Sequence, residues 1–380
     1  MRYLTNLFLI AASVAQSQPR IQLSHTTESL RGVSAVSRQI AWASGTHGTY
    51  LHTTDGGKTW IAAQVLDATS LDFRGVVAFS ADEAFLMSSG PGEQSRIYHT
   101  LDAGKHWTLQ FTNTNPKGFF DSIAFWDPKH GVALGDPIPY ENGKLKFEVL
   151  ITDDGQSWHS VSPAQLPEAL EGEGAFAASN TCIAMVRNAM KGSDRTDPNI
   201  WFATGGKAAR VFHSGDQGKT WEVFETPIIH GPDSAGIFSI VFRDPEHGVI
   251  AGGDYKHPRD DGPNLAFTDD GGKTWKLSDI KPQAYFSAVA YDRSVETIAL
   301  TQEAAQKATE TAGKKVRVKP VPPQRLFIVG QDFILDFRPP VDPRRISGKR
   351  EQGFDFNSVS AYPDGGALVV GPKGVIASIP

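Results

Sequence analysis

The sequence predicts an all-β protein, a seven-bladed β-propeller in which an N-terminal strand completes the last blade. An octet with Asp, Gly and Trp at fixed positions occurs five times, and its Asp residues are 47, 51, 63 and 54 residues apart. Strand-like stretches such as RIYH and TLQF flank the copies. A period near 50 residues, with several strands per repeat, is typical of four-stranded propeller blades.

Each octet has the residue types of a hairpin connection. Asp accepts hydrogen bonds from backbone N–H groups ahead of it, Gly adopts positive φ, and the first hydroxyl closes the neck of the loop. The Trp then begins the next strand and is expected to pack between sheets. The copies are TTDGGKTW (53–60), TLDAGKHW (100–107), ITDDGQSW (151–158), SGDQGKTW (214–221) and TDDGGKTW (268–275). We assign structural roles to Asp55, Gly57, Trp60, Asp102, Gly104, Trp107, Asp153, Gly155, Trp158, Asp216, Gly218, Trp221, Asp270, Gly272 and Trp275.

The first residues predict export. Residues 1–17 combine a basic Arg2, an apolar run too short to span a membrane, and small residues at Ser13 and Ala15, which is the pattern of a secretory signal peptide. No cysteine follows to accept a lipid, and no later stretch is apolar enough for a spanning helix. We expect a periplasmic or secreted mature chain, 18–380, that forms one propeller.

Blades 1 to 5 are each expected to begin with an innermost strand and a second strand before the octet. The pairs are LRGVSAVS and QIAWASGTHG, FRGVVAFS and EAFLMSSG, FFDSIAFW and HGVALGDP, and GAFAAS and IWFATGG, and in blade 5 both strands lie in GIFSIVFRDPEHGVIAGGDY.

The last two blades lack the octet. AYFSAVAY and RLFIVGQDFILDF predict a sixth blade with an insertion at 301–324, for which we expect a solvated loop, a partner-binding arm being the alternative. FNSVSAYPDGGALVVGPKGVIASIP supplies three strands of a seventh blade, and IQLSHTT near the N-terminus is the expected fourth. The 362 residues from Pro19 to Pro380 give about 52 per blade over seven blades; six or eight blades remain alternatives.

Composition narrows the range of functions. With 37 basic and 42 acidic side chains and a net charge of −5, the chain has no general attraction for nucleic acid or anionic lipid. One cysteine, Cys182, excludes an internal disulfide. The histidines lack metal-site spacing and no phosphate-binding glycine motif opens a helix, so we expect neither a metal nor a cofactor.

The octets match the Asp-box, or BNR, repeat of sialidases and many other propellers. Together with FRGV, TTDGGKTW and GPKGVIASI, the chain resembles the photosystem II stability and assembly factors of plants and cyanobacteria and their bacterial relatives. GEGAFAAS (172–179) and AGGDY (251–255) further resemble relatives from non-photosynthetic bacteria. The resemblance implies a seven-bladed propeller that binds a membrane-protein assembly intermediate without chemistry of its own. It also implies an arginine patch, which Arg31 and Arg74 would supply.

The expected site is the mouth of the central channel, where innermost strands begin and where concave ligand sites usually lie. We predict an exported, non-catalytic binding or assembly module, monomeric, with a protein partner. One alternative is that these residues form a polar ring that only keeps the channel mouth solvated and binds nothing specific. A second alternative is a carbohydrate-active, sialidase-like enzyme, although the Arg-(Ile/Val/Leu)-Pro segment of sialidases is not present. The candidate residues are Arg31, Arg74, Asp121, Asp136, Phe238, Asp254, Tyr255, Tyr285 and Asn357.

Overall fold

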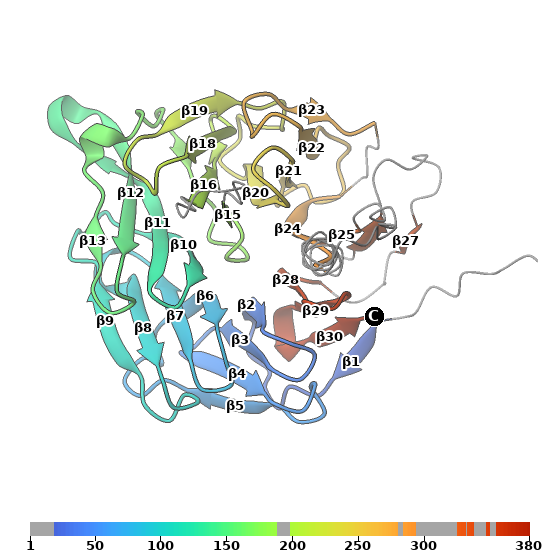
Figure 1. Cartoon of the computed structure of the whole chain (residues 1–380). Helices are drawn as coiled ribbons and strands as arrows, with labels where there is room; N and C mark the ends of the chain where they lie inside the picture. Colours follow the sequence, from blue (N-terminus) through green and yellow to red (C-terminus); the bar gives the residue numbers. More distant parts are fainter. Residues whose placement is uncertain are drawn as a thin grey trace, which may run out of the picture.

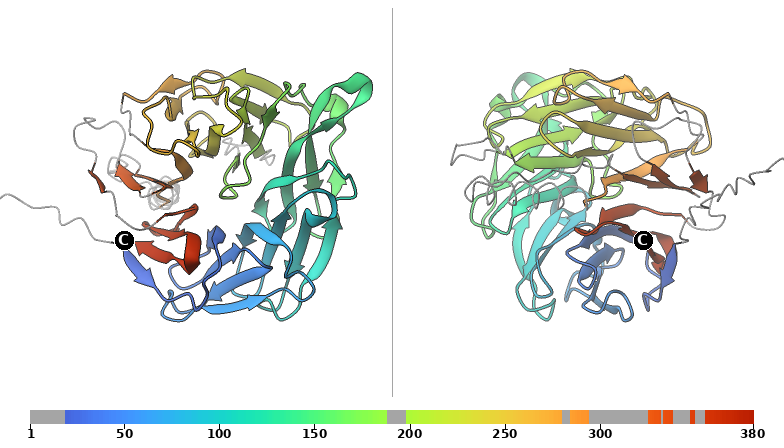
Figure 2. Two further views of the ribbon diagram at one scale, coloured as in Figure 1. Left: turned by 180° about the vertical axis from the view of Figure 1, so that it is seen from behind. Right: turned by 45° about the vertical axis from the view of Figure 1, so that its right-hand side comes forward.

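The chain is an all-β β-propeller. The computed structural model describes residues 19–187, 198–279, 284–293, 325–331, 333–337, 347–349 and 355–380. Short antiparallel strands in these residues form seven sheets around a ring (Figure 1), seen from behind in Figure 2. The predicted signal peptide (1–17) and insertion (301–324) lie outside the described residues. Within the described ranges, no helix has the length and apolarity needed to cross a membrane.

The first half of the chain contains β1 (Arg20–Gln22), β2 (Leu30–Ala35), β3 (Ala41–Gly45), β4 (Thr49–Thr53), β5 (Ile61–Gln64), β6 (Asp72–Ala78), β7 (Ala84–Ser89), β8 (Arg96–Thr100), β9 (Thr108–Thr112), β10 (Phe120–Asp127), β11 (His130–Pro139), β12 (Leu145–Thr152), β13 (His159–Ser160), β14 (Glu173–Gly174) and β15 (Ile183–Arg187). The second half contains β16 (Pro198–Ala203), β17 (Gly205–Gly206), β18 (Arg210–Ser214), β19 (Glu222–Glu225), β20 (Ala235–Phe242), β21 (Gly248–Asp254), β22 (Leu265–Thr268), β23 (Lys276–Leu277), β24 (Phe286–Tyr291), β25 (Leu326–Gly330), β26 (Phe333–Phe337), β27 (Ser347–Lys349), β28 (Ser358–Ala361), β29 (Ala367–Val370) and β30 (Ile376–Ile379). The described residues also contain the single 3-10 turns η1 (Gly92–Gln94), η2 (Glu141–Gly143), η3 (Pro163–Gln165) and η5 (Pro372–Gly374).

Most sheets form from one continuous stretch of chain. The orders β2-β3-β4-β5, β6-β7-β8-β9, β10-β11-β12-β13 and β24-β25-β26-β27 follow the sequence directly. The sheet β15-β16-β18-β19 skips β17, which joins β14 at the inner edge of the sheet β20-β21-β22-β23. Each sheet therefore needs mainly local pairing, and the ring arises when the sheets pack face to face.

The two ends of the described chain close the ring. β1 pairs antiparallel with β30, placing Arg20 opposite Ser378 and Gln22 opposite Ile376, in the sheet β1-β30-β29-β28. The predicted role of the segment that begins at Ile21 is thus confirmed. Closure leaves no open gap between the first and last sheets, which would otherwise present unpaired strand edges.

The core lies between neighbouring sheets. Trp201 on β16 stacks on Phe242 of β20 with ring centroids 3.8 Å apart, and the cluster that contains them also includes Trp275. Fully burying a large apolar side chain stabilises a fold by roughly 1.5–3 kcal/mol. Repeated around the ring, such contacts hold together sheets that share few backbone hydrogen bonds.

Serine hydroxyls link innermost strands that do not pair with each other. The Ser34 Oγ accepts a hydrogen bond from the N–H of Ala78 in the next sheet at 3.0 Å. The Ser239 Oγ accepts one from the N–H of Val289 at 2.9 Å in the same way. These side chains satisfy backbone donors that a continuous sheet would have paired.

The octets form the predicted turns. In the first copy, the Thr53 hydroxyl accepts the N–H of Gly57 at 3.0 Å, and Asp55 accepts both the N–H and the hydroxyl of Thr59. The Thr59 hydrogen bonds lower the pKa of Asp55 to about 2. Asp102, Asp216 and Asp270 make equivalent bonds. These carboxylates are already engaged within their own loops.

The third octet departs from the prediction. Asp154, and not Asp153, accepts the N–H groups of Gln156 and Ser157 at 2.7 and 2.8 Å, because this turn is one residue shorter. The hydroxyl at its neck belongs to Thr152. The structural role assigned to Asp153 is therefore wrong: Asp153 is exposed and lies 3.8 Å from His159.

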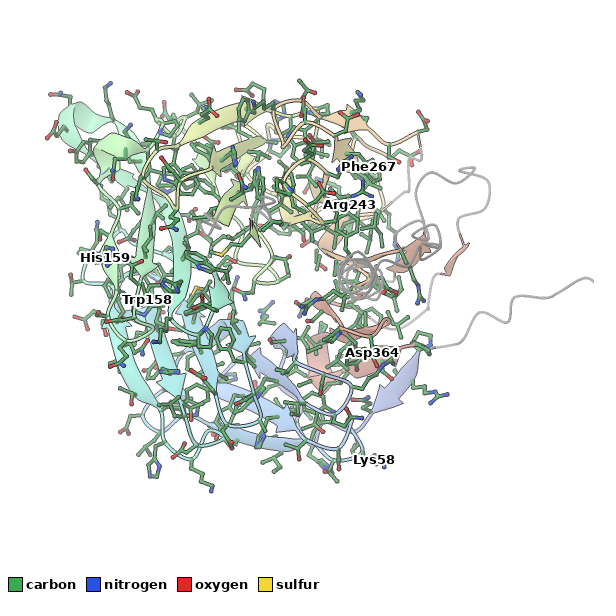
Figure 3. The ribbon with its side chains drawn as sticks, in the orientation of Figure 1. Lys58, Trp158, His159, Arg243, Phe267 and Asp364 are labelled. Atoms are coloured by element: carbon green, nitrogen blue, oxygen red, sulfur yellow. The ribbon has the colours of Figure 1, made fainter. Side chains whose placement is uncertain are left out.

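The tryptophans pack as expected. Trp60 donates from Nε1 to Gln22 Oε1 at 2.8 Å and so ties the first octet to β1. Trp158 donates likewise to Gln110 at 3.1 Å, and Figure 3 labels it beside His159 at the outer side of the ring. Trp221 and Trp275 donate to the carbonyls of their own turn glycines, Gly218 and Gly272.

The innermost strand of the fourth blade was predicted wrongly. Within GAFAAS only Gly174 lies in a strand, the two-residue β14, and the innermost strand of the fourth blade is instead β15, which starts at Ile183. Residues 175–181 instead turn into the centre of the ring (Figure 1). Apolar and small residues resemble a buried strand whether they pair with a sheet or fill a cavity, which explains the error.

Candidate functional site

Residues 175–181, here called the channel segment, fill the centre of the ring. Its polar groups bond to the innermost strands of five other sheets. The Ala177 carbonyl accepts Arg74 Nη1 of β6, Asn180 Oδ1 accepts the N–H of Ile123 of β10, and the Thr181 carbonyl accepts the N–H of Ile240 of β20. The Ser179 hydroxyl donates to the Ser287 carbonyl of β24 at 2.8 Å. The Ser179 carbonyl accepts a hydrogen bond from the Ser358 hydroxyl of β28 at 2.9 Å. The channel segment separates the two ends of the channel.

Three charged side chains lie at the end of the channel where the innermost strands begin. Asp72 lies between two arginines: its Oδ2 is 2.8 Å from Arg74 Nε, and its Oδ1 is 3.7 Å from Arg31 Nε. The Arg31 side chain is 28% exposed, yet its buried Nε has no hydrogen-bond partner. Burial lowers the pKa of Arg31 and the negative charge of Asp72 opposes that effect. Two guanidinium groups thus face one carboxylate, and the buried Arg31 Nε and Asp72 Oδ1 lie 3.7 Å apart, each without a hydrogen bond.

An aromatic cluster borders Arg31. Phe176 of the channel segment stacks on Phe238 with centroids 3.8 Å apart and planes 7° apart. Tyr285 meets Phe238 edge-on at 4.7 Å, and Tyr255 does so at 6.2 Å. Burial raises the pKa of Tyr285, and the positive charge of Arg31 opposes this rise. Tyr255 is 47% exposed, so the cluster has a solvent-facing edge.

Two carboxylates lie on the other side of Arg74. Asp121 is 1% exposed, and burial raises its pKa well above the ordinary value, with a further contribution from Asp136 and an opposing one from Arg74. Burial also raises the pKa of Asp136 to about 6, although the N–H of Ala175 donates to its Oδ1 at 2.9 Å. The channel mouth therefore has a cationic part and an acidic part that meet at Arg74.

Two of the predicted candidates are engaged in local structure. Asp254 accepts the N–H of Lys256 at 2.9 Å and lies 2.8 Å from His257 Nδ1. Burial would raise the pKa of Asp254, but these hydrogen bonds outweigh it and lower the pKa. Asn357 donates from Nδ2 to the Leu30 carbonyl at 2.7 Å and so joins the last sheet to the first.

The structure brings the other seven candidates into one connected group. They are Arg31, Arg74, Asp121, Asp136, Phe238, Tyr255 and Tyr285. Sequence reasoning missed Asp72 and Phe176. Asp72 stands two residues before Arg74, so its side chain falls on the same face of β6 as that of Arg74, which is a signal the sequence did contain.

A larger cavity lies at the other end of the channel. It measures about 1100 Å³ and is lined by the second halves of innermost strands and the turns that follow them, including Arg243, Asp244 and His247; Figure 3 labels Arg243. This is the octet side of the ring, since the N–H of Gly271 in the fifth octet donates to the carbonyl of Glu246 in the same group of turns. Among the residues the structure describes, no group of three or more His, Cys, Asp or Glu side chains is placed to hold a metal ion.

Comparisons with known proteins agree with this architecture. The model of the BNR/Asp-box repeat matches residues 266–277. The photosystem II assembly protein Ycf48 of Thermosynechococcus vestitus is 24% identical in an alignment of 290 residues that covers 60% of this chain and 80% of the relative.

Solved structures show the fold. A structure described as Ycf48 bound to D1 peptide superposes with a TM-score of 0.60 at 14% identity, covering 97% of this chain and 98% of that one. Ycf48 from Cyanidioschyzon merolae gives 0.56 at 15% identity, covering 96% and 98%. The WD40 propeller domain of Doa1 gives 0.57 at 10% identity, covering 95% and 97%. The chain is thus a BNR/Asp-box repeat protein related, at low identity, to the photosystem II assembly factor Ycf48.

Proposed function

We propose that this protein is an exported, non-catalytic propeller that binds a segment of a protein partner at the channel mouth and acts as an assembly module. The observation that carries the proposal is the buried Nε of Arg31, which has no hydrogen bond and lies 3.7 Å from Asp72 Oδ1, beside an aromatic cluster with an exposed edge. An unsatisfied buried donor costs roughly 1–3 kcal/mol, which a bound acceptor would recover. A Ycf48 structure that contains a D1 peptide supports a polypeptide as the ligand of such a ring.

The shape of the mouth favours a surface-bound segment over a threaded one. The channel segment lies across the ring, and its Ser179 and Asn180 are bonded to strands on opposite sides. A ligand at this end would therefore rest on Phe176 and Arg31. Arginine and tyrosine are enriched among residues that dominate protein interfaces. We infer that the partner segment binds Arg31 through an acidic or amide group and packs an apolar side chain against Tyr255.

The remaining features of the proposal concern the whole chain. We propose a signal peptide at 1–17, a single seven-bladed propeller at 18–380, and a monomer in the periplasm or outside the cell. The seven sheets of the described residues support the blade count. A membrane-protein assembly intermediate is the proposed partner class, on the basis of the relationship to Ycf48.

The binding proposal is tested by capture from detergent-solubilised membranes with quantitative mass spectrometry. Three immobilised proteins are compared: the wild type, Arg31→Gln, and Lys58→Gln, which makes the same charge change in the first octet at the periphery of the ring (Figure 3). Loss of one charge-assisted hydrogen bond should reduce recovery of the specific partner about tenfold or more. We expect that loss for Arg31→Gln and unchanged recovery for Lys58→Gln. Equal recovery with all three proteins would contradict the proposed site.

The absence of catalysis is tested separately. A panel of fluorogenic sialosides and β-glucosides should show no turnover above that of a buffer blank. Reproducible turnover that disappears in Arg31→Ala or Arg74→Ala would show that the channel mouth is an active site, and the binding proposal would then be wrong.

A further inference from the structure

A smaller pocket lies beside the channel mouth, on the acidic side. It measures about 380 Å³, within the range of about 300–1,000 Å³ that ligand pockets occupy. Its walls come from β11, the β14 region, the channel segment and β17, and we call it the Asp136 pocket. The lining residues are Lys117, Asp136, Pro137, Gly172, Glu173, Gly174, Ala175, Phe176, Gly205, Gly206 and Asp233.

Glycines make the walls thin. A side chain at Gly174 would place Cβ 2.9 Å from Asp136 Oδ1, and one at Gly205 would meet Phe176 at 2.2 Å. Gly206 adopts φ of +82°, and its Cβ would lie 2.3 Å from the Gly172 carbonyl. The backbone of β14 and β17 can therefore approach Asp136 and Phe176 closely, which leaves the carboxylate on the inner surface of a narrow space.

Asp136 is the acidic group of this pocket that forms no ion pair with any residue that the structure describes. Its Oδ1 accepts one backbone N–H from Ala175. Its Oδ2 makes no hydrogen bond to any residue that the structure describes, and Asp136 takes part in none of the ion pairs found there. A desolvated carboxylate with a single hydrogen bond is costly unless a positive charge approaches it.

The other charged groups around the pocket do not provide that charge. Glu173 is buried and compensated by Arg210 Nε at 3.0 Å. Asp233 and Lys207 form a pair at 3.9 Å with both side chains exposed. Lys117 is exposed on the rim and forms no ion pair with Asp136.

Behind the pocket, on β10, lies a second carboxyl group, that of Asp121, whose pKa is raised well above its ordinary value by burial and by the negative charge of Asp136. Its Oδ2 is buried without a hydrogen-bond partner, and it interacts electrostatically with both Asp136 and Arg74. Arg74 is already bonded to Asp72 and to the Ala177 carbonyl. The electrostatics thus favour an added cation at the pocket.

We propose that the Asp136 pocket binds a basic side chain, lysine or arginine, of the protein partner. The proposal rests on the function proposed above, because it assigns a second anchor to the same bound segment. Asp136 accepts the ammonium or guanidinium group, and the glycines of β14 and β17, together with Phe176, surround the aliphatic stem. The segment would then present opposite charges to Arg31 and to Asp136, and this pairing would select its sequence and direction.

The first experiment is selection from a library of random displayed peptides by three proteins. These are the wild type, Asp136→Asn, and Asp153→Asn, a matched loss of one charge on the octet side. The asparagine at position 136 keeps the Oδ1 acceptor for the N–H of Ala175, so the pocket should still fold. We expect wild type and Asp153→Asn to enrich peptides with lysine or arginine at one constant position, and Asp136→Asn to lose that preference.

The outcomes separate the two proposals. The pocket proposal is wrong, while partner binding stands, if the enriched peptides have no constant lysine or arginine position. The same conclusion follows if Asp136→Asn enriches peptides with the same basic position as the wild type. If the wild type enriches no peptide at all, both proposals are wrong. Replacing the basic residue of an enriched peptide by glutamine should weaken binding to the wild type about tenfold and leave binding to Asp136→Asn within twofold.

A second experiment needs no partner. Carbon-13 carboxyl NMR follows the titration of Asp136 alone and with an excess of the blocked tripeptides Gly-Lys-Gly or Gly-Gln-Gly, or of free agmatine. Because the pKa of Asp136 is about 6, a bound cation should lower it, and the lysine peptide alone of the two peptides should do so. No difference between the two peptides would overturn the proposal. An effect of agmatine clearly larger than that of the lysine peptide would reassign the pocket to small amines.

Discussion

The buried ion pair next to the Asp136 pocket gives a sharp test of the electrostatics. Glu173 and Arg210 are 5% and 6% exposed. The Arg210 Nε donates to Glu173 at 3.0 Å, and the Thr204 hydroxyl and the N–H of Leu170 donate to the same carboxylate at 2.7 and 2.8 Å. Removing either partner leaves the other charge buried without compensation, which typically costs about 3–5 kcal/mol.

The two single substitutions should differ in their pH dependence. In Glu173→Gln the guanidinium cannot lose its proton, so we expect a loss of about 3–5 kcal/mol at both pH 7 and pH 5. In Arg210→Met the carboxylate can take up a proton instead. Protonating the carboxylate of an ordinary glutamate costs about 3.7 kcal/mol at pH 7 and about 1 kcal/mol at pH 5, since each pH unit corresponds to about 1.36 kcal/mol. Its destabilisation should therefore shrink by roughly 2–3 kcal/mol in acid.

The assay is urea-induced unfolding followed by tryptophan fluorescence, with free energies of unfolding compared with those of the wild type at each pH. The double variant Glu173→Leu/Arg210→Met removes both charges and should cost less than the sum of the single variants. Equal pH dependence of the two single variants would refute the reasoning. So would losses below about 1 kcal/mol for both, because the pair would then not be desolvated in solution.

Three further predictions concern the ring. Asp154→Ala should lower the thermal unfolding midpoint while Asp153→Ala leaves it unchanged, because Asp154 accepts the turn N–H groups; the reverse order would restore the original assignment. His52, His99 and His213 stack on Trp42, Phe85 and Trp201, and burial lowers the pKa of each. Since the unfolded chain then binds protons more readily than the folded chain, the free energy of unfolding should fall as the pH drops below about 6.5. Urea titrations between pH 7 and 5 should show a smaller fall in the free energy of unfolding for His52→Phe than for the wild type. An equal fall in both proteins would contradict the assignment. Gln22→Ala removes the acceptor of the hydrogen bond from Trp60 Nε1, which is 2.8 Å long. Backbone amide hydrogen exchange should therefore accelerate in β1 and β30 and stay unchanged in β10 and β11. Equal acceleration in all four strands would show that the ring opens elsewhere.

Much of the fold was predictable because its determinants are local. The hydrogen bonds of an octet join residues two to four positions apart, as between Thr53 and Gly57, so the residue types alone define the turn. The strands of a sheet mostly follow one another along the chain, and the missing strand of the last blade pointed to the N-terminal segment at Ile21. The third octet shows the limit of such reasoning, since Asp153 and Asp154 are adjacent and only the hydrogen-bond geometry distinguishes them.

The sequence by itself thus determined the propeller, its turns and its closure, because each depends on residue types within one repeat. The tertiary structure alone decided the site. Asp136 and Asp254 occupy matching sequence positions, yet one faces a pocket without an ionic partner and the other is bonded to His257. The channel segment is held by contacts that span 39 to 179 residues of sequence. Whether a buried charge is compensated depends on which distant blades surround it, and a repeat pattern carries no information about that.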